Sequence, residues 1–358
     1  MNALCWAEIS LDALTHNFEL VKEAAPDSKI MAVIKADAYG HSAIEASKAL
    51  AGADAFAVAR IHEALQLRHA GINKEIIILS GVLDAQDIVT CAAQQLTLVV
   101  HSSPCLELLK SATQPLDIWL KADTGMHRLG LDFEQLQHAK SLIQKSGINH
   151  RLRGLLTHLS DAEDVSNPKN EQQHQCLKAL STELQLPHLC LCNSAGLLFH
   201  PQMRHQWVRP GIMLYGANPS TETNNITQRL RPAMTVKAKV LDVKTVKQGE
   251  PVGYNETWRA DKDSQIATIA IGYADGYPRH AGNGTPVLIN DKYYPLAGRV
   301  SMDLITIDVS GGNVRPGDTA TLWGEGLPAE TIAEHAGTIS YHLFTGIAAR
   351  VEKRFLHG

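Results

Sequence analysis

From residue 30 to about residue 216, the chain alternates between two kinds of segment. Short, almost continuously apolar runs are separated by stretches whose apolar positions recur at helical spacing. Runs without polar alternation are typical of parallel strands that are covered on both faces. The pattern predicts strands at 30–36, 55–59, 75–81, 96–101, 116–122, 153–158, 188–193 and 207–215. The clearest helices between them are predicted at 42–50, 61–70, 132–145 and 171–184.

The number of these repeats indicates the architecture. Eight successive strand–helix units favour a closed (β/α)8 barrel of the TIM type. An open, doubly wound sheet is the alternative that the same pattern allows.

After about residue 225 the pattern changes to strands with few helices. Strands are predicted at 233–246, 266–273, 285–296, 302–309 and 319–323, and only 331–336 reads as a helix. Asn290-Asp291 is a hairpin signal within the third of these segments. We therefore predict an α/β barrel domain over 1–228 and a strand-rich domain over 229–358, joined by a polar segment at 218–228.

Composition and charge narrow the class of protein. A chain of 358 residues, 44% hydrophobic and 20% charged, is long enough for two globular domains. Lys and Arg number 33 and Asp and Glu 37, so the net charge of −4 gives no reason to expect nucleic acid or an acidic membrane surface. No apolar run could cross a bilayer, and residues 1–10 lack the regions of a secretion signal. A cytoplasmic protein with a small-molecule partner is expected.

The six cysteines predict neither a disulfide framework nor a metal site. None of them forms a Cys-x-x-Cys pair, and several lie in apolar surroundings. Cys190 and Cys192 would point to one face of a strand, but two thiolates alone do not make a metal site. We interpret all six as reduced residues, mostly of the core.

Polar residues stand where the barrel strands are predicted to end, which is where barrel enzymes carry their chemistry. The first strand closes with Lys35, and an unpaired ammonium group is costly to bury. A buried lysine has a lowered pKa and suits covalent chemistry with carbonyl groups. The later strands end near Lys121, Arg128, His158, Ser194 and Arg209. Each also has an ordinary alternative, such as a rim ion pair, a core histidine or a helix cap.

Together these residues point to a cofactor. The loops after strands seven and eight of a barrel commonly hold a phosphate group. Backbone N–H groups at Ser194 and at Gly211-Ile212 could donate to it. Because the chain has no Walker A or G-x-G-x-x-G motif, a lysine facing this cradle indicates pyridoxal 5′-phosphate (PLP) rather than a nucleotide.

The run at 33–41, VIKADAYGH, closely resembles the PLP-lysine signature of bacterial alanine racemases. The resemblance covers nearly the whole chain. Its other landmarks are 7–11, 120–130, 154–158, 193–195, 208–216, 253–254, 271–277 and 298–303. It implies a PLP-dependent interconversion of L-alanine and D-alanine by two bases in a homodimer. The product would supply peptidoglycan synthesis, or the reaction would serve alanine catabolism.

The resemblance also implies a role for each matching residue. Lys35 would bind PLP covalently and act as one base, and Tyr254, supplied by the partner subunit, would act as the opposite base. Arg209 would hydrogen-bond the pyridine nitrogen, and His158 would orient Arg209 and the tyrosine. The phosphate would be bound by Tyr39, Ser194, Gly211, Ile212 and Tyr341. The substrate carboxylate would be bound by Arg128 and by the N–H of Met302 of the partner subunit. The supporting residues would be Lys121 (as a carbamate), Tyr273 and Asp303.

Four positions depart from the pattern of the family: Ser42, Asn255, His342 and the pair Glu352-Lys353. The first two neighbour catalytic positions and are expected to tune the rate. Three rival functions follow from related folds: a racemase for serine or a basic amino acid, a barrel-type PLP decarboxylase, and a PLP carrier. The decarboxylases carry a cysteine motif in the second domain, whereas this chain has no cysteine after Cys192. The carriers have a single domain.

Overall fold

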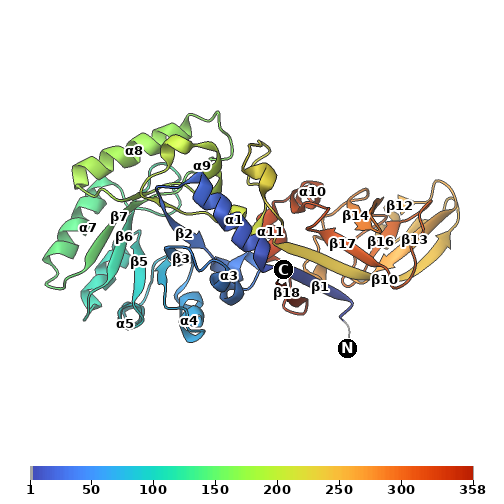
Figure 1. Cartoon of the computed structure of the whole chain (residues 1–358), viewed down its shortest axis with the longest axis horizontal. Coiled ribbons are helices and arrows are strands. Elements are labelled where there is room, and N and C mark those ends of the chain that lie inside the picture. Colours follow the sequence, from blue (N-terminus) through green and yellow to red (C-terminus); the bar gives the residue numbers. More distant parts are fainter. Residues whose placement is uncertain (1–2, 358) are drawn as a thin grey trace.

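The computed structural model describes residues 3–357, and its first half is a closed barrel of eight parallel strands (Figure 1). Each strand pairs with the next, and the last pairs with the first, which confirms the predicted barrel over the open sheet. The strands are β2 (Lys29–Val33), β3 (Ala55–Val58), β4 (Glu75–Ile78), β5 (Leu96–Val100), β6 (Asp117–Lys121), β7 (Arg151–Leu156), β8 (Leu189–Cys190) and β9 (Trp207–Val208).

Helices on the outside of the barrel connect these strands (Figure 1). The four predicted helices are present with ends shifted by at most two residues, and α7 begins with a capping box between Asp132 and Gln135. The helices of this half are α1 (Leu11–Ala24), the short segment α2 (Lys35–Tyr39), α3 (Ala43–Ala49), α4 (Ile61–His69), α5 (Ala85–Ala93), α6 (Ser103–Leu108), α7 (Phe133–Lys145), α8 (Lys169–Leu184) and α9 (Ser194–Phe199).

The second half is built on an eight-stranded sheet. Its longest strand, β10 (Met234–Val246), pairs with β1 (Cys5–Ser10), β13 (Ser264–Ile269) and β17 (Thr319–Trp323). β1 also lies parallel to β18 (Glu352–Leu356), so both ends of the chain join this sheet. The other members are β14 (Pro286–Ile289), β15 (Lys292–Pro295) and β16 (Ile305–Asp308), and β11 (Pro251–Val252) and β12 (Trp258–Arg259) form a separate hairpin.

The predicted hairpin at Asn290-Asp291 is confirmed. Both residues have positive φ angles, 49° and 59°, and they connect β14 to β15. Such angles at both central residues are the feature of the turn that matches the twist of the flanking strands.

The predicted elements differ from the structure in several places, because strands were mostly predicted too long, and two differences bear on the site. The strand predicted at 207–215 ends at Val208, because Pro210 has no N–H to donate and Gly211 begins a turn, η3 (Ile212–Tyr215). The second half also contains a helix beyond α10 (Ala329–His335), namely α11 (Ser340–Thr345). Its six residues are too few to show a helical period in the sequence.

One continuous apolar core joins the two halves. Met31 and Phe56 of the barrel, Trp323 of the sheet and Phe344 of α11 belong to the same buried cluster. A shared core of this kind holds the barrel and the sheet in one fixed arrangement. No helix within residues 3–357 is long and apolar enough to cross a membrane.

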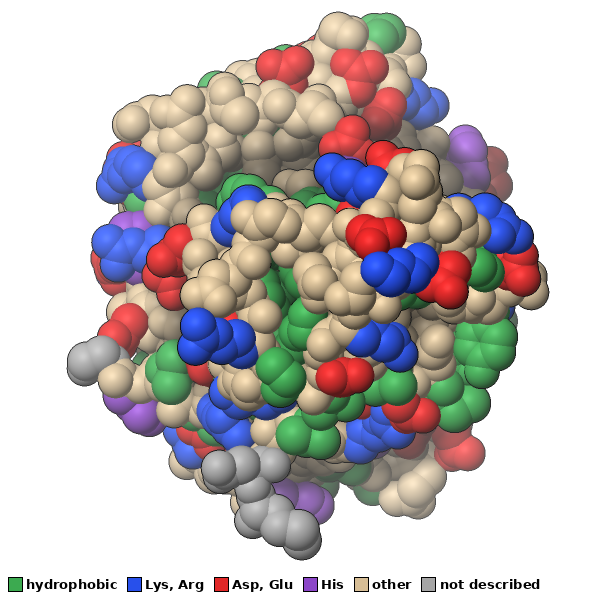
Figure 2. All heavy atoms as spheres, turned by 90° about the vertical axis from the view of Figure 1, so that its right-hand side faces the viewer, with side chains coloured by type: hydrophobic (Ala, Val, Ile, Leu, Met, Phe, Trp, Pro, Cys, Tyr) green, Lys and Arg blue, Asp and Glu red, His purple; other side chains and the backbone are tan. Residues whose placement is uncertain are grey.

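Figure 2 shows the end of the molecule formed by the second half. Positive and negative side chains alternate over this face, with apolar side chains between them and no extended area of one sign. This distribution agrees with the nearly balanced charge of the whole chain.

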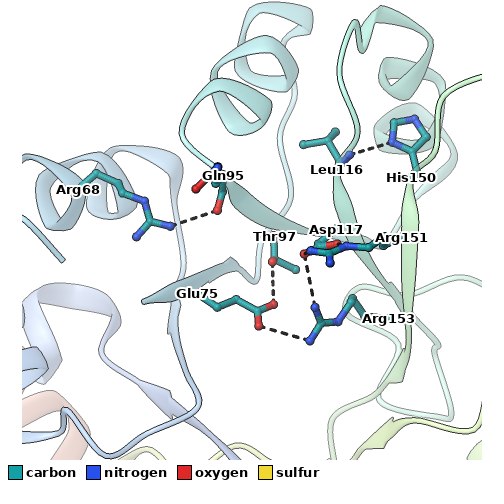
Figure 3. A network of polar contacts seen from close by, with 9 residues as sticks. All are labelled: Arg68, Glu75, Gln95, Thr97, Leu116, Asp117, His150, Arg151 and Arg153. Carbon is teal, nitrogen blue, oxygen red and sulfur yellow. Dashed lines mark hydrogen bonds and ion pairs between the residues drawn. The ribbon is translucent and has the colours of Figure 1, made fainter. Parts of the chain in front are cut away.

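A polar network ties together the amino ends of four barrel strands (Figure 3). Arg153 of β7 contacts Asp117 of β6 and Glu75 of β4, each at 3.4 Å. Glu75 also accepts a hydrogen bond of 2.8 Å from Thr97 of β5, and Arg151 pairs with Asp117. The network lies at the amino ends of the strands, whereas the candidate active-site residues lie at the carboxyl ends. It is therefore expected to contribute to stability and not to catalysis.

Replacing Arg153 with Ala should therefore lower the melting temperature by about 2–4 °C, since a partly exposed ion-pair network contributes on the order of 1 kcal/mol. Arg151→Ala is the matched control, because Arg151 shares Asp117 but is largely exposed, and its effect should be smaller. Calorimetry checks both variants. Equal melting temperatures for the wild type and Arg153→Ala would contradict a stabilising role for the network.

Candidate active site

Lys35 lies on a strained turn at the carboxyl end of β2. The strand ends at Val33, three residues before the end of the predicted strand at 30–36, and the segment α2 (Lys35–Tyr39) follows. Four consecutive residues, 36–39, have φ angles between 51° and 54°. The left-handed conformation costs roughly 1–2 kcal/mol for each residue that is not glycine. Neighbouring groups must therefore hold this turn in place.

Glu63 is one of these groups. Its Oε1 accepts a hydrogen bond of 2.6 Å from the N–H of Ala36, directly after Lys35. Its Oε2 accepts from the N–H groups of Ala59 and Arg60 at 2.8 and 2.9 Å. The sequence analysis missed this residue, although a glutamate at the third position of a predicted helix is a known capping signal.

Three further contacts hold the same turn. The ring Nδ1 of buried His41 donates to the carbonyl groups of Ala38 and Tyr39 at 3.0 and 2.9 Å. Lys353 of β18 forms an ion pair of 2.7 Å with Asp37. This contact gives a structural role to one of the positions that depart from the family pattern.

Four cationic or titratable side chains gather around Lys35: Arg128, Arg209, Lys121 and His158. Burial lowers the pKa of Lys35, and the charges of Arg209 and Arg128 lower it further. Burial and the same two arginines lower the pKa of Lys121 to about 8. The pKa of His158 is held well below its usual value, mainly by burial and then by Arg209. The structure thus brings together the predicted group from four different strand ends.

Arg209 is the most constrained member of this group. Its Nη2 donates to Nδ1 of His158 and to the carbonyl group of Thr157, both at 2.9 Å. Its Nη1 donates to the sulfur of Cys190 at 3.0 Å. Because an arginine only donates, Nδ1 of His158 must be the acceptor, so the neutral imidazole carries its proton on Nε2.

Two of the residues predicted to bind a phosphate group, Ser194 and Gly211, lie together beside Tyr39. Ser194, at the start of α9, accepts through its Oγ from the N–H groups of Gly211 and Met213 at 2.9 and 3.3 Å. Its own hydroxyl hydrogen is therefore directed elsewhere. A Cβ atom placed on Gly211 would lie 2.7 Å from Oη of Tyr39, so only glycine leaves this space open. Ile212 follows as the first residue of η3 and is buried.

Tyr39 and Tyr341 lie close to each other. Their ring centres are 5.8 Å apart, and Tyr341 belongs to α11, the helix that the sequence analysis missed. Burial raises the pKa of Tyr39 to about 12 and raises that of Tyr341 as well. Both phenols therefore keep their protons near neutral pH and can donate to an anion.

The other predicted residues lie on the second domain, apart from Lys35. Tyr254 is 69% exposed and Met302 53% exposed, and Tyr273 is also accessible. Backbone hydrogen bonds place Tyr273 beside the loop of Met302, while Asp303 pairs with Arg350 at 2.6 Å. Within residues 3–357, no hydrogen bond or ion pair connects these four residues to the group around Lys35.

Comparisons with known proteins identify the family. The model of the alanine racemase N-terminal domain matches residues 9–219, and that of the alanine racemase C-terminal domain matches residues 233–355. The chain belongs to the alanine racemase family. An alanine racemase of Aeromonas hydrophila is 44% identical over 355 residues, covering 96% of this chain and 97% of that protein.

Solved structures of alanine racemases have the same fold. The biosynthetic alanine racemase of Pseudomonas aeruginosa superimposes with a TM-score of 0.95 at 38% identity, covering 99% of this chain and all of the other. The alanine racemase of Bartonella henselae, described with covalently bound pyridoxal phosphate, gives a TM-score of 0.90 at 31% identity, with coverage of 99% and 100%. In residues 3–357 of this chain, no cluster of three or more His, Cys, Asp and Glu could hold a metal ion.

Substituting Glu63 with Gln should loosen the turn after Lys35, because one carboxylate oxygen that accepts from backbone N–H groups is lost. Hydrogen bonds to charged groups contribute about 1.5–3 kcal/mol, so amide exchange in the peptide covering 36–40 should accelerate roughly 10- to 100-fold. Glu45→Gln on α3 is the control, since Glu45 only pairs with exposed Lys48. Unchanged exchange in Glu63→Gln would show that the carboxylate does not hold the turn.

Acid should destabilise the protein through His41. Burial lowers the pKa of this histidine to about 4 in the folded state, and its Nε2 has no hydrogen-bond partner among residues 3–357. The unfolded chain therefore binds the extra proton first, and the contribution of His41, roughly 3 kcal/mol, should be lost as the pH falls from 6.5 towards 4. Urea unfolding of His41→Asn should show a flatter dependence on pH than the wild type. Parallel curves would exclude His41 as a cause.

Proposed function

We propose that the protein interconverts L-alanine and D-alanine with PLP as its cofactor, by removing the Cα proton on one face and returning a proton on the other. Membership of the alanine racemase family and the relatives named above support the reaction. The observation that carries the proposal is the placement of Lys35, whose amine has a lowered pKa, among the cations Arg209 and Arg128 at the end of a barrel strand.

The residues present fit this cofactor. Gly211 leaves room beside Tyr39 for a phosphate group, and Ser194, Tyr39 and Tyr341 would donate to it. Ile212 would complete the cradle through its backbone. Lys35 is the amine that would hold the cofactor covalently, and Arg209 would donate to the pyridine nitrogen. When bound, PLP supplies the electron sink that delocalises the negative charge formed at Cα.

Lys35 and Tyr254 divide the proton transfer. A lysine amine with a lowered pKa has a larger neutral fraction near neutral pH, so it can accept a proton. Tyr254 would act on the opposite face. Because one chain leaves Tyr254 exposed on the second domain, we assign it to the active site of the partner subunit in a homodimer. Two fixed bases on opposite faces avoid moving a single base around the substrate.

The other side chains bind or orient. Arg128 and the N–H of Met302 of the partner subunit would bind the substrate carboxylate. Lys121, whose pKa is about 8, is partly neutral near physiological pH, which is the state that can form the carbamate expected to steady Arg128. His158 holds its proton on Nε2 and would donate a hydrogen bond to the oxygen of Tyr254, which would orient that phenol towards the substrate.

Several broader assignments belong to the same proposal. We assign residues 1–228 to cofactor binding, apart from β1 (Cys5–Ser10), which joins the sheet of the second half, and residues 229–358 to the opposite base. Tyr273 and Asp303 flank the loop of Met302 and would support the subunit contact. A cytoplasmic location is supported by the six cysteines, none of which forms a disulfide bond.

Alanine in D2O tests the reaction directly. With PLP and L-alanine, the Cα–H signal in proton NMR should disappear while chiral chromatography detects D-alanine. Lys35→Ala and Tyr254→Phe should each lower the rate by at least about a hundredfold, as expected for the loss of an acid–base group. Exchange of the Cα proton without D-alanine would mean that only one base works. The absence of exchange would overturn the proposed reaction.

Mixing two inactive variants tests the shared site. Heterodimers of Lys35→Ala and Tyr254→Ala would have one site with both defects and one site with neither. After subunit exchange, half of the dimers are mixed and half of their sites are intact, so about one quarter of the wild-type activity should return. A mixture that stays inactive although mass spectrometry shows heterodimers would place Tyr254 in its own subunit's site.

A further inference from the structure

Cys190 contacts the arginine at the centre of the active site. It is the last residue of β8, it is completely buried, and its sulfur accepts a hydrogen bond of 3.0 Å from Nη1 of Arg209. The sequence alone predicts that this cysteine is an ordinary residue of the core. Its position at the carboxyl end of a barrel strand instead places it beside the reacting groups.

The contact completes the fixation of Arg209. The guanidinium group is planar and has five N–H donors in fixed directions. Three of them donate within the protein, to Cys190 on one strand and to Thr157 and His158 after the neighbouring strand. Among residues 3–357, no hydrogen bond engages Nε–H. Anchors on both sides of the planar group leave this donor free to face a ligand in a single orientation.

We propose that Cys190 is the positioning residue for Arg209: its thiol fixes the guanidinium group through a hydrogen bond without adding an opposing charge. The inference rests on the proposed function, in which Arg209 meets the pyridine nitrogen of PLP. It concerns this chain's own side chains, and its effects are measurable in the protein before any turnover.

The absence of charge on this acceptor matters for the surrounding groups. Burial raises the pKa of the Cys190 thiol, so it stays protonated although Arg209 acts in the opposite direction. The charge of Arg209 therefore continues to act on Lys35, Lys121 and His158. Together with burial and the charge of Arg128, it lowers the pKa of each of these three groups. The opposing carboxylates that act on the two lysines, Glu63 and Asp123, are on other segments.

A carboxylate at the same position would have a different effect. It would hold Arg209 at least as firmly, because hydrogen bonds between charged groups are the stronger kind. It would also cancel much of the charge of Arg209, which adds to burial in lowering the pKa of Lys35. The thiol thus orients Arg209 without reducing the positive charge that acts on Lys35. Substitutions of Cys190 can test these two effects separately.

The first test removes or restores the acceptor. Cys190→Ala should lower kcat about tenfold with KM changed less than twofold, and should weaken PLP binding to the apoenzyme by a similar factor. Cys190→Ser keeps a neutral acceptor and should recover most of both losses. Cys192→Ser is the matched control, because the buried sulfur of Cys192 contacts the carbonyl of Met203 instead. It should behave like the wild type.

The second test adds a charge. The apoenzyme is mixed with PLP at a series of pH values, reduced with borohydride, and the modification of Lys35 is measured by mass spectrometry. Cys190→Asp should move the midpoint of this reaction to higher pH than in the wild type, whereas Cys190→Ser should leave it in place. The reaction needs no turnover, so it reads the charge around Lys35 even if alanine is not the substrate.

The outcomes are separable. If Cys190→Ala binds PLP and turns over like Cys192→Ser, or if Cys190→Asp leaves the midpoint of Lys35 modification unchanged, the role of Cys190 is overturned. If Cys190→Ala does not fold, the comparison of Cys190→Ser with Cys190→Asp still decides the question. If PLP and borohydride modify Lys35 of the wild type but the enzyme does not racemise alanine, the proposed function is overturned. The pH midpoint of Lys35 modification in Cys190→Asp and Cys190→Ser then still decides the role of Cys190.

Discussion

The site depends on positive charge gathered where little water can screen it. An exposed lysine is protonated near neutral pH and cannot serve as a base or form a covalent bond to a carbonyl carbon. The pKa of Lys35 is lower than that of an exposed lysine, because burial and the charges of Arg209 and Arg128 all disfavour its ammonium form. The same surroundings lower the pKa of Lys121 to about 8 and keep His158 neutral.

The fold keeps this cluster in place against repulsion and strain. Closing eight strands into a barrel brings Lys35, Lys121, His158 and Arg209 to one rim, although they are far apart in the sequence. The left-handed turn after Lys35 needs anchors from three directions, and Glu63 supplies the one nearest to the lysine. The rim is therefore built from backbone contacts and buried hydrogen bonds.

The barrel and most of the rim could be predicted because parallel strands leave a simple signature in the sequence. Continuous apolar runs gave all eight strands, and the polar residues at their ends gave Lys35, His158 and Arg209. The strand over 207–215 was predicted too long because hydrophobicity continues past Pro210, where hydrogen bonding cannot. Helix α11 was missed because six residues carry no periodicity, although it holds Tyr341. The capping position of Glu63 was visible in the sequence, but its contact with the amide after Lys35 was not, and Cys190 was missed because Arg209 is distant in sequence.

The titration of Lys35 itself tests this account most directly. Lysines labelled with 13C at Cε can be followed by NMR in the apoenzyme from pH 6 to 12, with Lys35 assigned by its absence in Lys35→Ala. The account predicts that Lys35 titrates at a clearly lower pH than the exposed lysines in the same spectrum. A Lys35 signal that titrates together with the exposed lysines would contradict it, because neither burial nor the cations around the amine would then affect its protonation.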